Sequence, residues 1–285
     1  MSAGTSDLLF KVAQQNILSL EKYSALSGGD INQVYLLECQ EGRFVVKLNH
    51  TNKFPGMFHA EQSGLQQLAE PGVIDIPKII ATGEIINQSY LLLEYKPEGK
   101  KSSKFWSDFG EQLARLHKCT SASFGLDSNN YIGSLPQYND YRENAADFYL
   151  EMRFEPQLKM AIDNGFNLEI PETFFETIRN IIPQEAPSLI HGDLWSGNFL
   201  VNSEGAPCLI DPAVAFASRE MDLAMMKLFG GFDQELFNVY NEVFPLEKGW
   251  QDRILLWQLY YLMVHLNIFG TPYKERVESI IKHYS

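Results

Sequence analysis

The sequence predicts an α+β fold with two lobes, a small antiparallel-sheet lobe in residues 1–95 and a mainly helical lobe in residues 96–285. Short strand-like runs dominate the first third of the 285 residues, and apolar residues at helical spacing dominate the rest. The turn-forming residues between 95 and 101 mark the expected hinge. With 45% hydrophobic residues, the chain can bury a substantial core in each part.

The first lobe shows two hairpin patterns and one helix. Residues 32–38 and 42–48 are strand-like runs around a tight turn, and residues 83–86 and 90–95 form a second such pair. Between the two pairs, residues 56–69 have the apolar spacing of an amphipathic helix. We therefore expect a sheet of antiparallel strands that carries one helix.

The second lobe begins with a helical stripe. Its apolar side chains recur three or four positions apart, at Phe105, Phe109, Leu113 and Leu116. Residues 250–269 predict a second, longer apolar helix. These patterns favour a lobe built around packed helices.

Charge and composition restrict the partners and the compartment. The formal net charge of −13 argues against nucleic acid, because binding to the phosphate backbone depends on clustered Lys and Arg. No apolar run reaches the ~18 residues of a membrane span, and the start lacks a signal-peptide pattern. We expect a cytoplasmic protein without a membrane partner. Cys39, Cys119 and Cys208 lack metal-ligand spacing and are expected to be core thiols. The sequence does not determine the oligomeric state.

The most informative motif is His191-Gly192-Asp193-Leu194-Trp195-Ser196-Gly197-Asn198, followed by Asp211. The interval from Asp193 to Asn198 equals that of the kinase catalytic loop, in which the aspartate accepts the proton of the attacking hydroxyl and the asparagine holds magnesium. Each residue taken singly is equally typical of a turn or a cap. The complete ordered set favours phosphate transfer from ATP.

A hairpin would bring the two expected magnesium ligands together. Residues 199–201 and 208–210 are short apolar runs around a turn-forming segment, so they predict paired strands. Asn198 precedes the first strand and Asp211 follows the second, which places both side chains at the same end of the hairpin. Oxygen ligands of this kind suit Mg²⁺, which keeps waters and is completed by substrate phosphates.

Lys47 and Glu61 are predicted to form an ion pair. Lys47 interrupts an apolar strand, and Glu61 falls on the apolar face of the helix over residues 56–69. An unpaired buried carboxylate would be costly. The pair also matches the kinase arrangement that directs a lysine toward the nucleotide phosphates. The alternative is a surface lysine with a glutamate at the edge of a helix.

Other nucleotide contacts are predicted from position. Gly28 and Gly29 precede the first long strand, where glycine lets backbone N–H groups approach phosphate. Glu94 and Tyr95 end a strand where a kinase hinge would offer backbone groups to adenine. A Walker A sequence is absent, which disfavours the P-loop class.

These motifs resemble those of the fructosamine kinases, also called ketosamine 3-kinases, which are relatives of the aminoglycoside phosphotransferases and choline kinases with a protein-kinase-like fold. The resemblance extends from about residue 16 to the end. Its most specific parts are the 191–198 motif with Trp195 and the segment 130–137. Weaker similarity lies at residues 28–32, at Arg153 and at residues 228–232.

The resemblance implies ATP-dependent phosphorylation of the sugar 3-hydroxyl of a ketosamine, which makes the adduct unstable and frees the amine. Carried over to this chain, Asp193 is the catalytic base, Asn198 and Asp211 bind Mg²⁺, and Lys47 with Glu61 positions the phosphates. Asp222 would brace the catalytic loop or cap a helix.

The acceptor side is less defined. Trp195 would pack either on the substrate or beneath the loop, and Tyr131, Arg153 and the helix with Trp257, His265 and Asn267 are candidate lining residues. His265 is the weakest candidate among them, because a histidine on so apolar a helix is more often a hydrogen-bonded core residue. His117 is expected to face the core. His191 is expected to support the loop through hydrogen bonds.

Two alternatives remain open. The chain could phosphorylate another small alcohol, such as an aminoglycoside or a choline-like acceptor, with the same machinery. It could also be a silent nucleotide-binding scaffold, although the combined presence of the five polar motif residues argues against that. The sequence specifies neither the ketosugar nor the amine. It carries no cysteine beside Gly28 and Gly29 and no activation loop after Asp211, so redox control there and activation-loop phosphorylation are not expected.

Overall fold

The computed structural model describes residues 3–26 and 31–285. Its first part is a five-stranded antiparallel sheet with the strand order β1-β2-β3-β5-β4. These strands are β1 (Leu20–Ala25), β2 (Gln33–Cys39), β3 (Gly42–His50), β4 (Ile79–Ile85) and β5 (Gln88–Glu94). The two hairpins predicted from the sequence are present, with β4 and β5 longer than expected. We refer to residues 3–26 and 31–94 as the sheet region.

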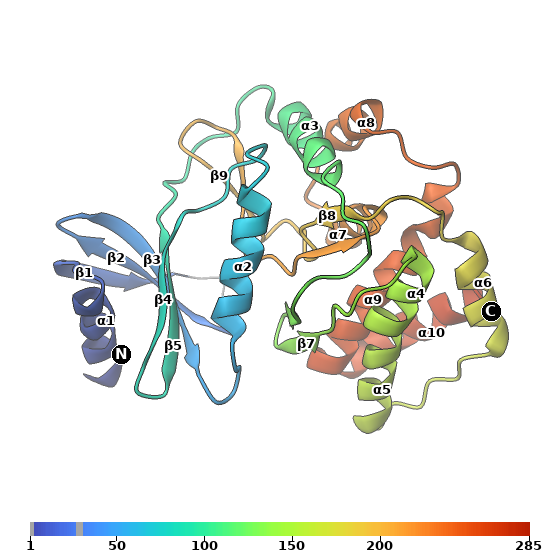
Figure 1. Cartoon of the computed structure of the whole chain (residues 1–285), viewed down its shortest axis with the longest axis horizontal. Helices are drawn as coiled ribbons and strands as arrows, with labels where there is room; N and C mark the ends of the chain where they lie inside the picture. Colours follow the sequence, from blue (N-terminus) through green and yellow to red (C-terminus); the bar gives the residue numbers. More distant parts are fainter. Residues whose placement is uncertain (1–2, 27–30) are drawn as a thin grey trace.

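Each face of the sheet carries one helix (Figure 1). Helix α1 (Ala3–Gln15) covers one face, where Leu9 and Val12 pack in a cluster with Leu92. Helix α2 (Met57–Ala69) covers the other face, in a cluster with Leu91 of the same strand. Successive side chains of β5 thus serve opposite cores, as the pleat of a strand requires. The sequence analysis identified α2 but not α1.

The rest of the chain is mainly helical and is called the helical region. Its helices are α3 (Phe105–His117), α4 (Ala145–Tyr149), the π-helix η1 (Leu150–Phe154), α5 (Glu155–Asp163), α6 (Glu172–Ile181), α7 (Glu220–Phe229), α8 (Gln234–Val243), α9 (Trp250–Phe269), the short η2 (Thr271–Tyr273) and α10 (Lys274–His283). Helix α9 has the predicted bounds, and it is largely buried at the centre of this region (Figure 1). The α+β class is confirmed.

Three short hairpins or strand pairs connect these helices. They are β6 (Asn130–Ile132) with β7 (Leu135–Gln137), β8 (Ser188–Ile190) with β11 (Ala215–Ala217), and β9 (Phe199–Val201) with β10 (Pro207–Leu209). The β9–β10 hairpin lies where the sequence predicts it, with the second strand one residue earlier.

Two other expectations can be compared with this structure. Cys208 is buried, whereas Cys39 and Cys119 are partly buried and pack against the edges of two core clusters, so the prediction of core thiols is confirmed for Cys208 and holds in part for the other two. In the described part of the chain, no helix combines the length and the apolar character needed to cross a membrane.

Candidate active site

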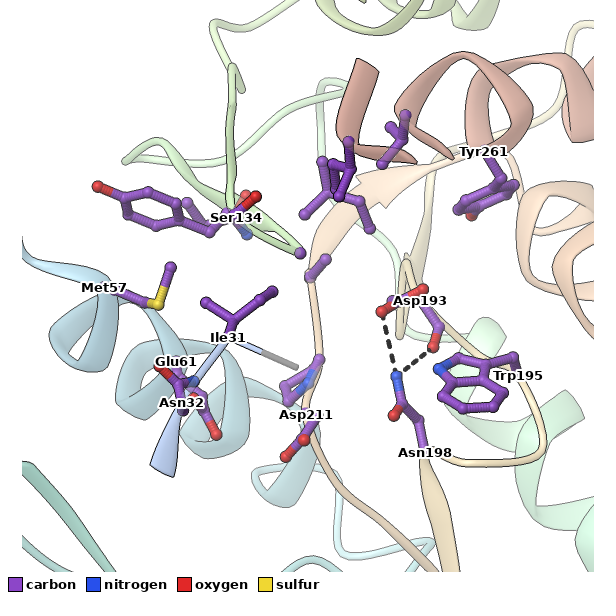
Figure 2. Close-up of a pocket in the computed structure, with 18 of the residues that line it drawn as sticks. Ile31, Asn32, Met57, Glu61, Ser134, Asp193, Trp195, Asn198, Asp211 and Tyr261 are labelled. Atoms are coloured by element: carbon purple, nitrogen blue, oxygen red, sulfur yellow. Dashed lines mark hydrogen bonds between the residues drawn. The ribbon is translucent and has the colours of Figure 1, made fainter. Parts of the chain in front are cut away.

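A cavity of about 680 Å³ lies between the sheet region and the helical region. Its walls include Lys47 and Glu61 from the sheet region and Asp193, Asn198 and Asp211 from loops of the helical region. Figure 2 shows Glu61 on one side, Trp195 and Tyr261 on the other, and the three loop residues between them. The five polar residues singled out in the sequence therefore share one cavity.

The lysine of β3 is held by two carboxylates. Lys47 Nζ lies 2.5 Å from Glu61 Oε1 of α2, so the predicted ion pair is present. The same ammonium group donates a hydrogen bond to Asp211, which the sequence analysis did not foresee. Burial disfavours the charge on Lys47, but Asp211 and Glu61 outweigh burial and raise the pKa of the ammonium group. Lys47 is thus a fixed cation on the cavity wall.

Helix α2 can bring Glu61 this close because Gly64, one turn later, faces the Asp211 segment. A Cβ atom on Gly64 would lie 3.1 Å from the Val214 side chain and 3.4 Å from that of Pro212. Glycine therefore permits the tight packing of α2 on residues 212–214.

The loop that carries Asp193 is held from below by Asp222. The Asp222 carboxylate accepts hydrogen bonds from His191 N (2.7 Å) and Gly192 N (2.8 Å), and it contacts His117 Nε2 (3.1 Å). Burial would raise its pKa, but the hydrogen bonds from His117 and Gly192 hold the pKa of Asp222 below its usual value. Arg219, not Asp222, is the residue that precedes α7, so the side chain braces the loop instead of capping the helix.

His191 and Gly192 join this loop to the Asp211 segment. His191 Nδ1 accepts the Asp193 N–H (3.3 Å), and His191 Nε2 donates to the Ile210 carbonyl (2.9 Å). Gly192 has φ of +81°, and a Cβ atom there would lie 2.0 Å from the Ala213 carbonyl oxygen. Only glycine permits both this conformation and this approach.

Asp193 lies on the cavity wall beside Asn198. The Asn198 amide nitrogen donates to the Asp193 carbonyl oxygen (2.8 Å) and to its carboxylate (3.1 Å), shown dashed in Figure 2. Burial, and next the nearby carboxylate of Asp211, raise the pKa of Asp193 well above its usual value. A carboxylate in such surroundings has an increased affinity for a proton.

The β9–β10 hairpin brings Asn198 and Asp211 to one end, as its sequence indicates. Phe199 pairs with Leu209, and Ile210 N donates to the Asn198 carbonyl at 3.1 Å. Asp211 has φ of +57°, a left-handed conformation that aspartate tolerates better than most residues. In this conformation the Asp211 carboxylate lines the cavity and accepts the hydrogen bond from Lys47.

The donor set at this end suits a magnesium ion. The Asn198 amide nitrogen is engaged by Asp193, which leaves its carbonyl oxygen as the available ligand atom, and Asp211 offers carboxylate oxygens. The described residues contain no cluster of three or more His, Cys, Asp or Glu side chains that could hold a metal. Two oxygen ligands without a full protein cage are typical of Mg²⁺ sites completed by phosphates.

Two buried amides fix the backbone that follows Asp211. Asn130 Nδ2 donates to the Val214 carbonyl (2.8 Å), and Gln137 Nε2 donates to the Ala213 carbonyl (3.0 Å). The Tyr260 hydroxyl in turn donates to Gln137 Oε1 at 2.6 Å. The sequence analysis marked the segment 130–137 by resemblance alone. It missed this role, because a carbonyl more than seventy residues away leaves no local signal.

The candidate substrate residues separate into two groups. Trp195 and Tyr131 line the cavity. The Trp195 ring lies over Gly197, where a Cβ atom would come within 2.3 Å of it, and the Tyr131 hydroxyl donates to the Pro55 carbonyl at 2.9 Å. Trp195 thus faces the cavity and packs on its own loop at the same time.

Arg153 does not line this cavity, so the structure contradicts its expected place in the acceptor pocket. Its guanidinium is buried and donates to the carbonyls of Tyr138 and Met152 and to Asn139 Oδ1. Arg153 lies in the π-helix η1 as one of its buried residues, and the sequence pattern did not show this local irregularity.

On α9, only one of the three candidate residues reaches the cavity. Trp257 is buried and donates to Glu220 (2.8 Å), and Asn267 donates to Gln157 (2.8 Å). His265 lines the cavity, with its Nδ1 bonded to the Tyr261 carbonyl at 2.7 Å. His117 is buried, as expected.

The residues of α9 that face the cavity are Tyr261, Val264, His265, Ile268 and Phe269. They recur at intervals of three and four, so helical periodicity could have identified this face. The sequence analysis did not name Tyr261, which is buried and lines the cavity.

The remaining predicted nucleotide contacts are Glu94, Tyr95, Gly28 and Gly29. Glu94 and Tyr95 do not line this cavity: Glu94 pairs with Lys96 (3.2 Å), and the Arg43 guanidinium lies 4.6 Å from the centre of the Tyr95 ring. Gly28 and Gly29 lie outside the described residues.

Comparison with known proteins was made on sequence and on structure. A family model described as fructosamine kinase matches residues 1–285. The chain is 37% identical over 263 residues to a probable ketoamine kinase of Enterococcus faecium, covering 90% of this chain and 93% of the relative. It is 33% identical over 273 residues to the chloroplastic protein-ribulosamine 3-kinase of Arabidopsis thaliana, covering 93% and 83%.

Solved structures show the same relationship. A protein provisionally named fructosamine-3-kinase from Haemophilus somnus 129PT has a TM-score of 0.88 at 26% identity, covering 97% of this chain and 96% of that one. The aminoglycoside phosphotransferase APH(4)-Ia has a TM-score of 0.62 at 14% identity, covering 98% of both chains, and shares the fold. The kinase-like fold expected from the sequence is confirmed.

Proposed function

This chain belongs to the fructosamine kinase family, and we propose that it uses ATP and Mg²⁺ to phosphorylate the 3-hydroxyl of the sugar in a ketosamine. Family membership establishes a phosphotransferase that acts on a sugar hydroxyl of ketosamines, and it supports this function over the scaffold and over other acceptors. The donor, the metal, the hydroxyl and the residue roles are our proposals.

The observation that carries the proposal is the position of Asp193. It lies on the cavity wall with its carboxylate bonded to Asn198, and Lys47 and Asp211 line the same cavity. Burial and Asp211 raise its pKa, so the carboxylate is a better proton acceptor than an exposed one. A base beside a fixed cation and a metal-type donor set is the arrangement that phosphate transfer requires.

In the proposed reaction, Asp193 accepts the proton of the sugar hydroxyl while the sugar oxygen attacks the γ-phosphorus of ATP. The new P–O bond forms as the bond to the β-phosphate oxygen breaks, and ADP leaves. Lys47, oriented by Glu61, would contact the phosphates of the nucleotide. Asn198 and Asp211 would hold Mg²⁺, which supplies positive charge to the phosphate oxygens when bound.

The remaining predicted residues have supporting or binding roles in this proposal. Asp222 and His191 support the loop, and residues 95–101 would act as the hinge between the lobes 1–95 and 96–285. Gly28, Gly29, Glu94 and Tyr95 stay candidates for contacts with the nucleotide, and of these Glu94 and Tyr95 do not line the cavity described above. Trp195 and Tyr131 are the candidates for the acceptor side.

The test measures ADP release with Mg-ATP and fructosamine, ribulosamine, aminoglycoside and choline acceptors. We expect turnover on a ketosamine, with a loss of about 10²- to 10⁴-fold in Asp193→Asn and little change in its affinity for ATP. Phosphate at the sugar 3-oxygen would be identified by NMR of the product. Turnover on choline or an aminoglycoside alone, or normal turnover by Asp193→Asn, would refute the proposal.

A further inference from the structure

The β6–β7 hairpin covers one side of the cavity. Its residues Tyr131, Gly133 and Ser134 line the cavity, and Figure 2 shows Ser134 above Ile31 in the view. Gly133 has φ of +57°, and a Cβ atom there would lie 3.1 Å from Ile268 Cδ1 and 3.7 Å from Ile31 Cδ1. The turn of the hairpin therefore lies between α9 of the helical region and the start of β2 in the sheet region.

The base of this hairpin is fixed to the helical region. Asn130 and Gln137, at its two ends, are buried and donate to the backbone carbonyls of residues 214 and 213. Gln137 Nε2 also donates to Asn130 Oδ1 at 2.8 Å, which joins the two strands. The hairpin should thus move as one body with the segment that carries Asp211.

The Tyr131 hydroxyl connects the hairpin to the sheet region. It donates to the Pro55 carbonyl at 2.9 Å, in the loop of residues 51–56 that precedes α2, and the Tyr131 ring meets that of Phe54 edge-on at 6.5 Å between centres. Burial raises the pKa of Tyr131, so the hydroxyl keeps its proton at neutral pH and remains a donor. We call this hydrogen bond the clasp.

The clasp and the proposed hinge lie at opposite ends of α2. Pro55 precedes this helix, whereas Asp75 follows it and accepts hydrogen bonds from Lys96 (2.9 Å) and Asn202 (2.8 Å). Lys96 belongs to the proposed hinge, and a helix of 13 residues is about 20 Å long. An opening that pivots at the hinge would therefore separate the two regions most at the clasp.

The clasp can persist while the nucleotide is bound. The contact between Lys47 and Asp211 also joins the two regions, but phosphates and a metal ion would compete for both of these side chains. The clasp joins a phenol hydroxyl to a backbone carbonyl, and neither group has a phosphate or metal partner in the proposed reaction. It is therefore the contact that can hold this side of the cavity closed during phosphate transfer.

We propose that the clasp between Tyr131 and Pro55 keeps water out of the cavity during transfer, so that the ketosamine and not water accepts the phosphate. Tyr131 is then a positioning residue that acts through the loop before α2. In the competing reaction a water oxygen bonds to the γ-phosphorus, the bond to the β-phosphate oxygen breaks, and ADP and inorganic phosphate leave, with the proton of the water passing to Asp193. Closure of an active site suppresses such hydrolysis. The inference rests on the proposed function, because it takes ATP and a ketosamine as the substrates.

Tyr131→Phe tests the clasp, because it removes the hydroxyl and keeps the ring. The first measurement is the amount of inorganic phosphate released per ketosamine phosphate formed, with Mg-ATP and the fructose adduct of methylamine. We expect this ratio to rise by about two- to tenfold, the range that corresponds to the loss of one hydrogen bond. A purely structural defect would lower both rates together and leave the ratio unchanged.

The second measurement is hydrogen exchange of the loop before α2, without substrates. The amides of Phe54 and Met57 donate within this part of the chain, to the carbonyls of His50 (3.2 Å) and Phe54 (3.3 Å). Loss of the clasp should increase their exchange rates by a similar factor, because the loop separates more often from the hairpin. This readout does not depend on activity.

Tyr141→Phe provides the matched control. The Tyr141 hydroxyl donates to Asp127 at 2.6 Å, and the residue is half exposed and does not line the cavity. This variant should keep the ratio and the exchange rates of the wild type. An unchanged ratio or unchanged exchange in Tyr131→Phe would overturn the inference and leave the proposed function intact. A wild type that phosphorylates no ketosamine would overturn both.

Discussion

The ammonium group of Lys47 donates a hydrogen bond to the carboxylate of Asp211, a residue 164 positions later in the chain. This contact joins the sheet region to the loop that follows the β9–β10 hairpin. Since Lys47 also pairs with Glu61, the lysine has two carboxylate partners of different burial. Nucleotide phosphates and a metal ion would compete for the Lys47–Asp211 contact, whereas the Lys47–Glu61 pair can persist.

The two partners of Lys47 should therefore differ in their effects when each is neutralised. The side chains of Lys47 and Glu61 are 7% and 11% exposed, and that of Asp211 is 40% exposed. Glu61→Gln leaves a buried ammonium group with one carboxylate and should lower the free energy of unfolding by about 1–3 kcal/mol. Asp211→Asn should cost less stability.

The two substitutions should affect turnover in the reverse order, with the larger loss for Asp211→Asn. Asp211→Asn should reduce kcat by at least about 10²-fold, because a charge aimed at the phosphates is lost, and Glu61→Gln should reduce it less. Urea denaturation and steady-state kinetics measure the two quantities, and Gln66→Ala on the exposed side of α2 is the control. The same rank order in both measurements would contradict this assignment.

Asp222→Asn tests the support of the catalytic loop. The amide that replaces the carboxylate has a single acceptor oxygen for the N–H groups of His191 and Gly192, so one buried donor loses its partner. We expect a loss of about 1–3 kcal/mol in the free energy of unfolding and a lower kcat through displacement of Asp193.

Asp233→Asn is the matched control for this substitution. Asp233 also accepts a backbone N–H, that of Glu235 at 2.9 Å, but it does so at the exposed start of α8. Because asparagine caps helices as well as aspartate does, stability and kcat should hardly change. A similar loss in both variants would show that the effect is not specific to the loop.

Two buried tyrosines should respond in opposite ways to loss of the hydroxyl. The Tyr149 hydroxyl donates to the Leu256 carbonyl at 2.6 Å, whereas that of Tyr261 has no hydrogen-bond partner among the residues described. Tyr149→Phe should lower stability by about 1 kcal/mol, and Tyr261→Phe should leave it unchanged or raise it. Thermal denaturation without ligands measures both, and equal losses would mean that the Tyr261 hydroxyl is satisfied in the free protein.

The stability of the fold should also depend on the protonation of His191. Burial lowers the pKa of this imidazole below its ordinary value of 6.5, and its two nitrogens serve as one donor and one acceptor only in the neutral form. As the pH falls below 6.5, the unfolded chain binds a proton that folded His191 does not, so stability decreases.

Melting curves between about pH 8 and pH 5 would reveal this contribution, with His191→Gln for comparison. Glutamine retains an N–H for the Ile210 carbonyl but does not titrate, so the variant should lose less stability on acidification than the wild type. Parallel pH dependences of the two proteins would exclude His191 as the cause.

Several parts of the site could be predicted because their signals are local. The five-residue interval between Asp193 and Asn198, the apolar strands on either side of a turn, and the charged residues on apolar faces are all visible in short windows of sequence. Each pattern implies one geometry, because successive side chains of a strand point to opposite faces and the outer ends of the two strands of a hairpin lie side by side. The Lys47–Glu61 pair and the place of Asn198 and Asp211 follow from these rules.

Other features had no signal of this kind. Helix α1 was missed, and Arg153 was expected in the acceptor pocket although it is buried within the π-helix η1 and does not line the cavity. The contacts of Asn130 and Gln137 with the backbone after Asp211 depend on how distant segments meet.

The sequence by itself determined the family of this protein, its fold class and the residues that we propose for phosphate transfer, because these follow from residue type and short spacing. Only the tertiary structure decided which side chains line the cavity. A group of adjoining rings that line the cavity consists of Trp195, Phe229 at the end of α7, His265 and Phe269 of α9, and Tyr273 of η2, and no local pattern connects them. Its members become neighbours only when the helices pack, since packing and not spacing brings distant side chains together.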